Sequence, residues 1–312
     1  MRPVQPVVDA HHHIWRQADL PWLSGPMLPR IFGPYEPIRR DYAIAEYLDD
    51  IADSGVVASV YVQANWPRDQ AEDEVRWVSE ISADAGWPQA IVGYCDLVSD
   101  DAPQVLQALA RYPLMRGIRM QLHWHQNEMY RFESVPDRMS DAVFRRHLAL
   151  LGDYGWTFDL QVFASQMASA ARLAAEFPET TFVLQHCGMP EDMGAAGRAQ
   201  WHEGMQRLAD QGNVACKLSG LGTFIHRNDP AHIAEVVSES VALFGPERCL
   251  FGSNFPIEKL WCAYGDLMTA YRQVLSAWNE NEQRQMLHDT AARVYRLDTE
   301  GQPAATPVAS WP

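Results

Sequence analysis

Short apolar runs rich in β-branched residues alternate with amphipathic helical patterns along almost all of this 312-residue chain. The predicted strands are Val7–His11, Ala58–Gln63, Gln89–Cys95, Met115–Leu122, Thr157–Val162, Thr181–Gln185, Val214–Leu218 and Cys249–Phe251. The predicted helices are Ala43–Ser54, Ala71–Gly86, Pro103–Arg111, Asp141–Tyr154, Gln166–Phe177, Arg198–Asp210, Ala231–Phe244 and Gly265–Trp278. Eight strand–helix units in strict alternation favour a parallel (β/α)8 TIM barrel with right-handed crossovers. An open doubly wound sheet is the alternative, although such sheets usually contain fewer strands.

Glycines at the expected helix ends support this count of strand–helix units. Five glycines each follow a helical pattern and precede a strand, where helices commonly end: Gly55, Gly86, Gly155, Gly212 and Gly245. The segment Glu280–Leu297 predicts one or two further helices that close the barrel. Because no Ser/Thr/Gly-rich linker divides the chain, we expect one barrel domain over residues 1–298. The Pro-, Ala- and Thr-rich segment Thr299–Pro312 is expected to be a short mobile tail.

Composition excludes some partners. The chain has 25 basic and 40 acidic residues, a net charge of −15, and an acidic surface repels the phosphates of nucleic acids. The five cysteines form no CxxC pair, which is typical of buried reduced thiols. No signal peptide follows Met1, and no apolar run approaches the roughly 20 residues that span a bilayer. We therefore expect a cytoplasmic protein with no membrane partner.

Six tryptophans could include residues of a homo-oligomer interface: Trp66, Trp77, Trp87, Trp201, Trp261 and Trp278.

Three consecutive histidines end the first predicted strand and are the best pointer to a chemical site. Side chains alternate faces along a strand, so His11 and His13 point the same way and His12 points the other way. Two imidazoles on one face can converge on one metal ion or one carbonyl oxygen. A tag remnant is the alternative, but tags usually lie in flexible polar sequence, whereas here an apolar strand precedes the run.

Other polar residues fall at strand ends, where the active face of such a barrel lies. His186 closes the sixth strand, although a lone histidine there could also be a hydrogen-bonded core residue. His123 and His125 follow the fourth strand, and at least one of them is expected to face the cavity. Arg119, on the same strand, suits an anionic substrate group or, alternatively, an internal carboxylate.

Lys217 and Ser219 share one face of the seventh strand. A lysine inside an apolar strand is costly to bury unless it is paired or functional, so a substrate contact and a structural salt bridge are both possible roles for Lys217.

Three of the loops that follow strands are candidates for shaping the site. The proline-rich loop Trp15–Asp41 is long enough to be a lid, the loop His123–Ser140 contains Tyr130, and the last begins Gly252-Ser-Asn-Phe-Pro256.

Five motifs, in order, are similar to those of the amidohydrolase-2 family over almost the whole chain. They are Asp9-Ala-His-x-His13, Arg116-Gly-Ile-Arg119, Gln185-His186-Cys-Gly188, Cys216-Lys-Leu-Ser-Gly220 and Leu250-Phe-Gly-Ser-Asn254-Phe-Pro256. The resemblance leans toward the branch with sugar-acid lactonases and 2-pyrone-4,6-dicarboxylate lactonase. It implies a distorted (β/α)8 barrel with its site at the strand C-termini. It also implies hydrolysis of a lactone or a related C–O or C–N bond.

The resemblance also assigns residues. The family's first-strand pair falls on His11 and His13, and its sixth-strand histidine on His186. The family's eighth-strand aspartate, which takes the water proton and helps to bind any metal, falls on Asn254. An amide has no useful basicity and is a poor ligand for a transition metal ion. Two readings stay open: the three histidines hold a divalent metal such as Zn²⁺ with an open water position, or they polarise the carbonyl without a metal.

We therefore predict a hydrolase that opens a small anionic lactone. Arg119 would bind a substrate carboxylate, Asn254 would hydrogen-bond the water or an oxyanion, and His123 or His125, with a pKa near neutrality, would be the base. Further substrate contacts are expected from Trp66, Lys217 and Tyr130. The first alternative is a metal-dependent decarboxylase of an aromatic acid, against which Asn254 counts. The second is a binding protein on a degenerate barrel, against which the surviving histidines and arginine count.

Overall fold

Eight parallel strands form a barrel in the computed structural model, which describes residues 5–299. They pair in sequence order: β1 (Val7–His12), β2 (Val56–Val62), β3 (Ala90–Gly93), β4 (Met115–Ile118), β5 (Thr157–Leu160), β6 (Phe182–Leu184), β7 (Val214–Leu218) and β8 (Cys249–Phe251). An isolated parallel bridge between His12 and Phe255 brings the chain after β8 against β1. The (β/α)8 barrel predicted from the sequence is confirmed.

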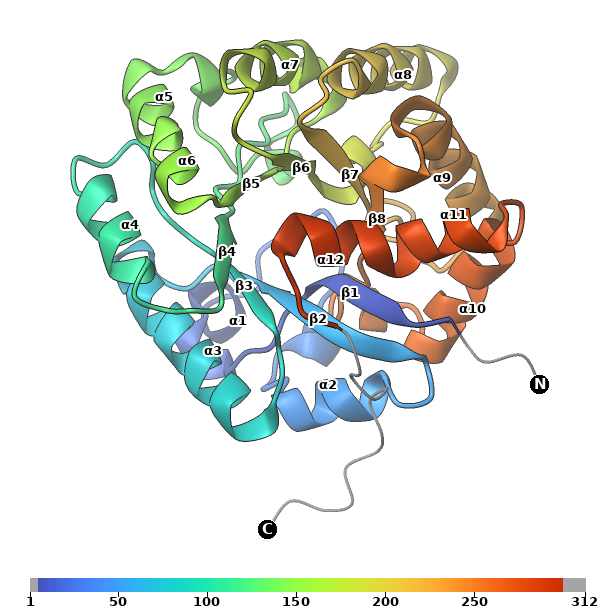
Figure 1. Ribbon diagram of the computed structural model, residues 1–312, viewed down its shortest axis with the longest axis horizontal. Helices are drawn as coiled ribbons and strands as arrows, with labels where there is room; N and C mark the ends of the chain where they lie inside the picture. The colour runs from blue at the N-terminus through green and yellow to red at the C-terminus, as the bar shows by residue number, and fades with distance from the viewer. Residues whose placement is uncertain (1–4, 300–312) are drawn as a thin grey trace.

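Helices surround the barrel, as Figure 1 shows. The α-helices are α1 (Pro21–Ser24), α2 (Ile44–Asp50), α3 (Ala71–Ala85), α4 (Ala102–Leu109), α5 (Ala142–Ala149), α6 (Leu151–Tyr154), α7 (Met167–Glu176), α8 (Ala195–Ala209), α9 (Pro230–Phe244), α10 (Tyr264–Leu275), α11 (Glu280–Arg284) and α12 (Thr290–Tyr295). A π-helical turn, Gln285–Asp289, joins α11 to α12. These last helices cross one end of the barrel, where α12 places Ala291 and Tyr295 in the interior core.

The structure refines the predicted boundaries. The helix expected over 141–154 is divided at Leu150 into α5 and α6. β4 ends at Ile118 rather than at Leu122. Beyond Ile118, continuous strand pairing gives way to an isolated bridge between Gln121 and Gln161. Arg119 and His123 therefore lie beyond the strand, at the mouth of the barrel. The predicted tail lies outside the described residues except for Thr299, so its mobility stays a prediction.

A buried carboxylate fastens the two ends of the barrel. Asp9 on β1 accepts hydrogen bonds from the backbone N–H and the hydroxyl of Ser253, at 2.8 and 2.6 Å. The hydroxyls of Tyr47 and Tyr264 also donate to it, at 3.0 and 3.1 Å. These bonds compensate the burial of the carboxylate and fix the segment after β8 against β1. The first-strand histidines and Asn254 are thereby held side by side.

None of the helices within residues 5–299 is long and apolar enough to cross a membrane. The cytoplasmic location and the homo-oligomer stay predictions. All five cysteines are free thiols, and Cys95, Cys187, Cys216 and Cys249 are buried, as their apolar surroundings predict.

Candidate active site

A cavity of about 120 Å³ opens at the carboxyl ends of the strands. Its polar floor comes from the ends of β1, β4, β5, β6 and β8: His13, Arg119, Gln121, His123, Gln161, His186 and Asn254. Its walls come largely from the loops after β1 and β4: Trp15, Trp22, Arg30, Phe32, Met129, Tyr130, Arg131 and Phe132. The cavity therefore lies on the face of the barrel that carries active sites in this architecture.

The two first-strand histidines face each other, with their Nε2 atoms 3.3 Å apart. The Nδ1 of His13 lies 2.6 Å from the carbonyl oxygen of Val62, and because a carbonyl only accepts, this nitrogen carries the proton. Burial lowers the pKa of both rings, so both are neutral, and the Nε2–H of His11 donates to His13. His12 points away from this pair and stacks on Tyr47 at 3.9 Å between ring centroids.

His186 completes this cluster from the end of β6. Its ring centroid lies 4.8 Å from that of His11, and its Nδ1 is 2.9 Å from the hydroxyl of Ser219. A Cβ at Gly220 would come within 2.5 Å of the same Nδ1, so glycine leaves the space that the ring occupies. Burial, followed by the charges of Arg119 and Lys217, lowers the pKa of His186, which keeps the imidazole neutral.

Arg119 is a buried cation at the end of β4. One guanidinium nitrogen donates to the carbonyl of Gln63, and Nε has no partner. Burial lowers its pKa to about 10, so the group is still charged at neutral pH. The sequence also allowed Arg119 to pair with an internal carboxylate. No carboxylate in residues 5–299 forms a salt bridge with it, so that alternative is wrong. Its charge is available to a ligand.

The structure separates the two histidines that follow β4. His123 lines the cavity, and its Nδ1 is buried without a partner. The prediction of a pKa near neutrality is wrong for this ring, because burial and then Arg119 lower the pKa to about 3. His125 lies outside the cavity lining, with its ring 5.3 Å from that of Tyr130 and its Nε2 3.9 Å from Glu191.

Asn254 lies on the floor of the cavity together with His13 and His186. Its backbone has a left-handed conformation with φ of 58°, and its N–H donates to the carbonyl of His11 at 2.7 Å. Asparagine tolerates this region better than most residues. The position of the family aspartate is thus on the cavity but carries an amide.

Two predicted substrate contacts lie outside the cavity lining. Lys217 is fully buried in the barrel, with its Nζ 2.8 Å from Asp159 and over the ring of Tyr295. The structural alternative therefore accounts for Lys217, because its side chain extends into the core rather than toward the mouth. Trp66 is buried and packs against Trp77 of α3, with 5.8 Å between the ring centroids.

The cavity contains residues that the sequence reasoning did not single out. Gln121 and Gln161 line its floor, and the side-chain oxygen of each is buried without a partner. The Nε atoms of Arg30 and Arg119 are in the same state. Buried polar groups are normally hydrogen-bonded, so these atoms are available as hydrogen-bond partners for a ligand in the cavity. Their position just after strand ends was the signal that could have identified the glutamines.

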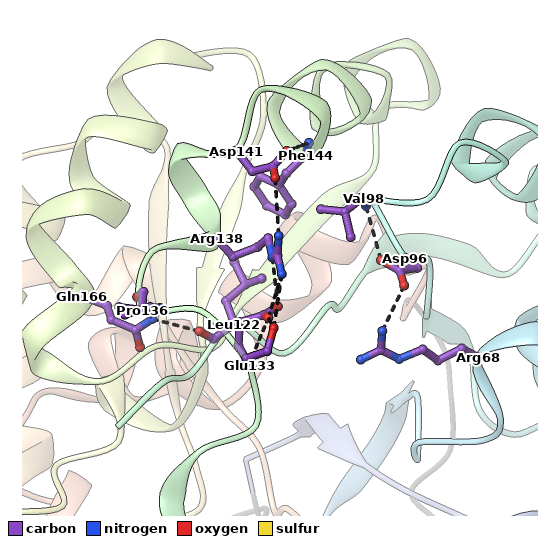
Figure 2. A network of polar contacts seen from close by, with 11 residues as sticks. Arg68, Asp96, Val98, Leu122, Glu133, Pro136, Arg138, Asp141, Phe144 and Gln166 are labelled. Atoms are coloured by element: carbon purple, nitrogen blue, oxygen red, sulfur yellow. Dashed lines mark hydrogen bonds and ion pairs between the residues drawn. The ribbon is translucent and has the colours of Figure 1, made fainter. Parts of the chain in front are cut away.

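Figure 2 shows polar contacts that hold the loop after β4 in place. Arg138 bridges Glu133, at 3.0 Å, and Asp141, at 3.4 Å. The side-chain amide of Gln166 donates to the carbonyls of Leu122 and Pro136, at 2.9 and 3.1 Å. This network anchors both ends of the segment that presents Met129, Tyr130 and Phe132.

The donor set does not fit a histidine-bound metal. A histidine that binds a metal almost always donates its other ring N–H to a partner, as His13 and His186 can, but Nδ1 of His11 has none. Over residues 5–299, no three His, Cys, Asp or Glu side chains are placed to hold one ion.

A model of the amidohydrolase family matches residues 8–297. The chain belongs to the amidohydrolase family. This confirms the resemblance drawn from the five motifs, and the chain is an enzyme. This amidohydrolase is 31% identical over 296 residues to the uncharacterized protein y4mH of Sinorhizobium fredii, with 93% of this chain and 98% of that protein covered.

Two further comparisons bear on the site. This amidohydrolase is 30% identical over 310 residues to an L-fucono-1,5-lactonase of Burkholderia multivorans, with 93% of this chain and 96% of that protein covered. It also resembles a solved amidohydrolase of Burkholderia multivorans with bound zinc, at 27% identity and a TM-score of 0.79. That comparison covers 94% of this chain and 100% of the other.

Proposed function

We propose that this amidohydrolase opens a small lactone that carries an anionic group. The observation that carries the proposal is a cavity whose lining contains His13, His186 and Asn254 beside the unpaired cation of Arg119, with no Asp or Glu among the described lining residues. An anionic substrate is favoured there because it meets cations and no like charge. The L-fucono-1,5-lactonase relatives support lactone hydrolysis as the reaction class.

Substrate binding follows from the two halves of the cavity. The guanidinium of Arg119 binds the anionic group, and its unpartnered Nε supplies a charge-assisted hydrogen bond. The aromatic rings of Trp22, Phe32 and Tyr130 cover the lactone ring and exclude water from the floor. Gln121 and Gln161 accept hydrogen bonds from substrate hydroxyls through their free oxygens.

Hydrolysis requires water to attack the carbonyl carbon, after which the ring C–O bond breaks to give a hydroxy acid. His123 is the proposed base, because its Nδ1 lone pair has no partner. Burial and, after it, the charge of Arg119 lower the pKa of His123, and a substrate anion at Arg119 offsets the second of these causes, so binding makes the ring more basic. His186 and Asn254 hydrogen-bond the carbonyl oxygen, the oxyanion or the water.

A pH-indicator assay over a panel of lactones tests the proposal. We expect acid release by the wild type, with a loss of about 10²–10⁴-fold in His123→Ala and His186→Ala. His202→Ala, on the exposed face of α8, is the control and should retain full activity. Unchanged hydrolysis in both cavity variants would overturn the assignment. Release of CO₂ from a benzoate-type acid would instead favour the decarboxylase hypothesis, and tight ligand binding with no turnover would favour the binding-protein hypothesis.

A further inference from the structure

Glu258 is a buried carboxyl that stands behind the cavity and has no role in the reaction described above. It begins a short 3-10 helix, Glu258–Leu260, one turn after Asn254, and its backbone N–H donates to the carbonyl of Asn254 at 3.2 Å. The residue is 1% exposed, and Oε1 has no hydrogen-bond partner. No cation within residues 5–299 forms an ion pair with it.

The carboxyl is built into the junction of two cavity loops. The side chain of Asn254 and the backbone N–H of Gly222 hydrogen-bond to it. A Cβ at Gly222 would lie 2.3 Å from Oε2, so the absence of a side chain there makes room for the carboxyl. Gly220 and Thr223, on either side of Gly222, line the cavity together with Asn254.

Glu258 can control the orientation of the Asn254 side chain because the two ends of a carboxamide differ chemically. A carboxamide has a donor end and an acceptor end, and a group behind it decides which end faces forward. An ionised Glu258 can only accept, so it takes the Nδ2–H of Asn254 and turns Oδ1 toward the cavity. A protonated Glu258 can donate to Oδ1, which turns Nδ2 toward the cavity.

We propose that Glu258 is a positioning residue that sets which end of the Asn254 carboxamide faces the substrate. With Oδ1 forward, Asn254 accepts a hydrogen bond from the attacking water and orients its lone pair. With Nδ2 forward, Asn254 donates to the carbonyl oxygen instead. The catalytic meaning of this switch rests on the proposed function, but the orientation of the amide does not.

The surroundings of Glu258 determine the pH range over which the Asn254 amide reverses. Burial raises the pKa of Glu258 to about 8, and the hydrogen bonds from Asn254 and Gly222 only partly oppose this. The titratable side chains that face it are Cys262, on the following segment, and Tyr271, on α10. Burial raises the pKa of both, so both are neutral over this range. Protonation of Glu258 is therefore the event that reverses the amide as the pH falls.

The test follows the Asn254 side-chain amide resonance by NMR between pH 6 and pH 9, assigned by its loss in Asn254→Asp. In the wild type we expect a pH-dependent shift and, with a lactone, a rate that falls about tenfold per pH unit below the midpoint. Glu258→Gln, which is isosteric and does not titrate, should abolish both pH dependences. Glu74→Gln is the matched control, because Glu74 is also buried and burial raises its pKa to about 7.

A second variant keeps the test decisive if Glu258→Gln fails to fold. Gly222→Ala displaces the carboxyl without removing it and should also uncouple the amide shift from pH, with thermal unfolding confirming the fold of each variant. Persistence of the amide shift in Glu258→Gln, or its loss in Glu74→Gln, would overturn the inference. A wild type that hydrolyses no lactone but shows the Glu258-dependent amide shift would overturn the proposed function alone.

Discussion

At the scale of single residues, the imidazoles of the site depend on what stands behind each ring. The carbonyl of Val62 fixes the proton of His13 on Nδ1, and the hydroxyl of Ser219 contacts the corresponding atom of His186. Both rings are buried and neutral, so their tautomers, rather than their charges, decide which nitrogen can accept a proton. The partners behind the rings therefore influence the reaction without contacting the substrate.

Ser219→Ala should reduce kcat by on the order of 10-fold while KM changes little, because it removes the group that orients His186. Steady-state kinetics on the lactone that the wild type hydrolyses best measures the effect. Ser240→Ala is the control, since that buried hydroxyl donates to Val236 on α9, away from the cavity. An equal loss in both variants would mean that the effect is one of stability.

The histidine cluster also predicts the metal content. Protein purified without chelators or nickel resin should contain well below one equivalent of zinc, and a chelator should leave its activity unchanged. The reason is the donor set, in which Nδ1 of His11 has no partner and Asn254 replaces a carboxylate. Elemental analysis by mass spectrometry decides the question. One tightly bound equivalent, lost together with activity on chelation, would contradict this prediction.

At the scale of elements, the loops after β1 and β4 build the walls of the cavity, and buried bonds hold the second of them in place. Glu133 is only 8% exposed and lies between Arg138 and Ser134. Burial raises the pKa of this carboxyl, but the hydrogen bonds from Arg138 and Ser134 outweigh it, so the pKa is lowered in the folded state. The stabilisation is present above the pKa of the unfolded chain and is lost as the pH falls through the folded value.

Arg138→Gln should therefore lower the free energy of unfolding by about 1–3 kcal/mol at pH 7, with a smaller loss at pH 4. Urea unfolding at the two pH values measures both numbers. Arg68→Gln serves as the control because its bond to Asp96, also drawn in Figure 2, involves an arginine side chain that is 65% exposed. We expect that variant to change the free energy by less than about 1 kcal/mol. A cost for Arg138→Gln that does not depend on pH would argue against the ion pair as its origin.

At the scale of the whole molecule, the barrel is closed by polar groups that span its interior. Asp9 connects β1 to the segment after β8, and Lys217 connects β7 to Asp159 on β5. The hydroxyl of Tyr295, from α12, lies 3.1 Å from the same Asp159 carboxylate. The helix that crosses the end of the barrel is thus bonded to the interior ion pair.

Lys217→Met should lower the free energy of unfolding by about 3–5 kcal/mol, because it leaves the carboxylate of Asp159 buried without its cation. Urea unfolding measures the loss, and Lys217→Met combined with Asp159→Asn should recover a large part of it. A double variant no more stable than the single one would show that the cost came from packing rather than from the unpaired charge.

The sequence by itself determined the strand–helix alternation, the barrel and the family, because these follow from local periodicity and from motifs at strand ends. It also placed His13, His186, Arg119 and Asn254 on one face, since parallel strands bring their carboxyl ends together. Strand periodicity cannot tell how deep a side chain lies, and so it left Lys217 open between the substrate and the core.

Only the tertiary structure decided what depends on contacts between distant segments. It separated His123 from His125, showed that burial and the charge of Arg119 lower the pKa of His123, and brought Gln121 and Gln161 to the floor of the cavity. It also placed Glu258 behind Asn254 through the space left by Gly222. Burial and hydrogen-bond partners set the charge and direction of these groups, and both are properties of the packed fold rather than of any local pattern.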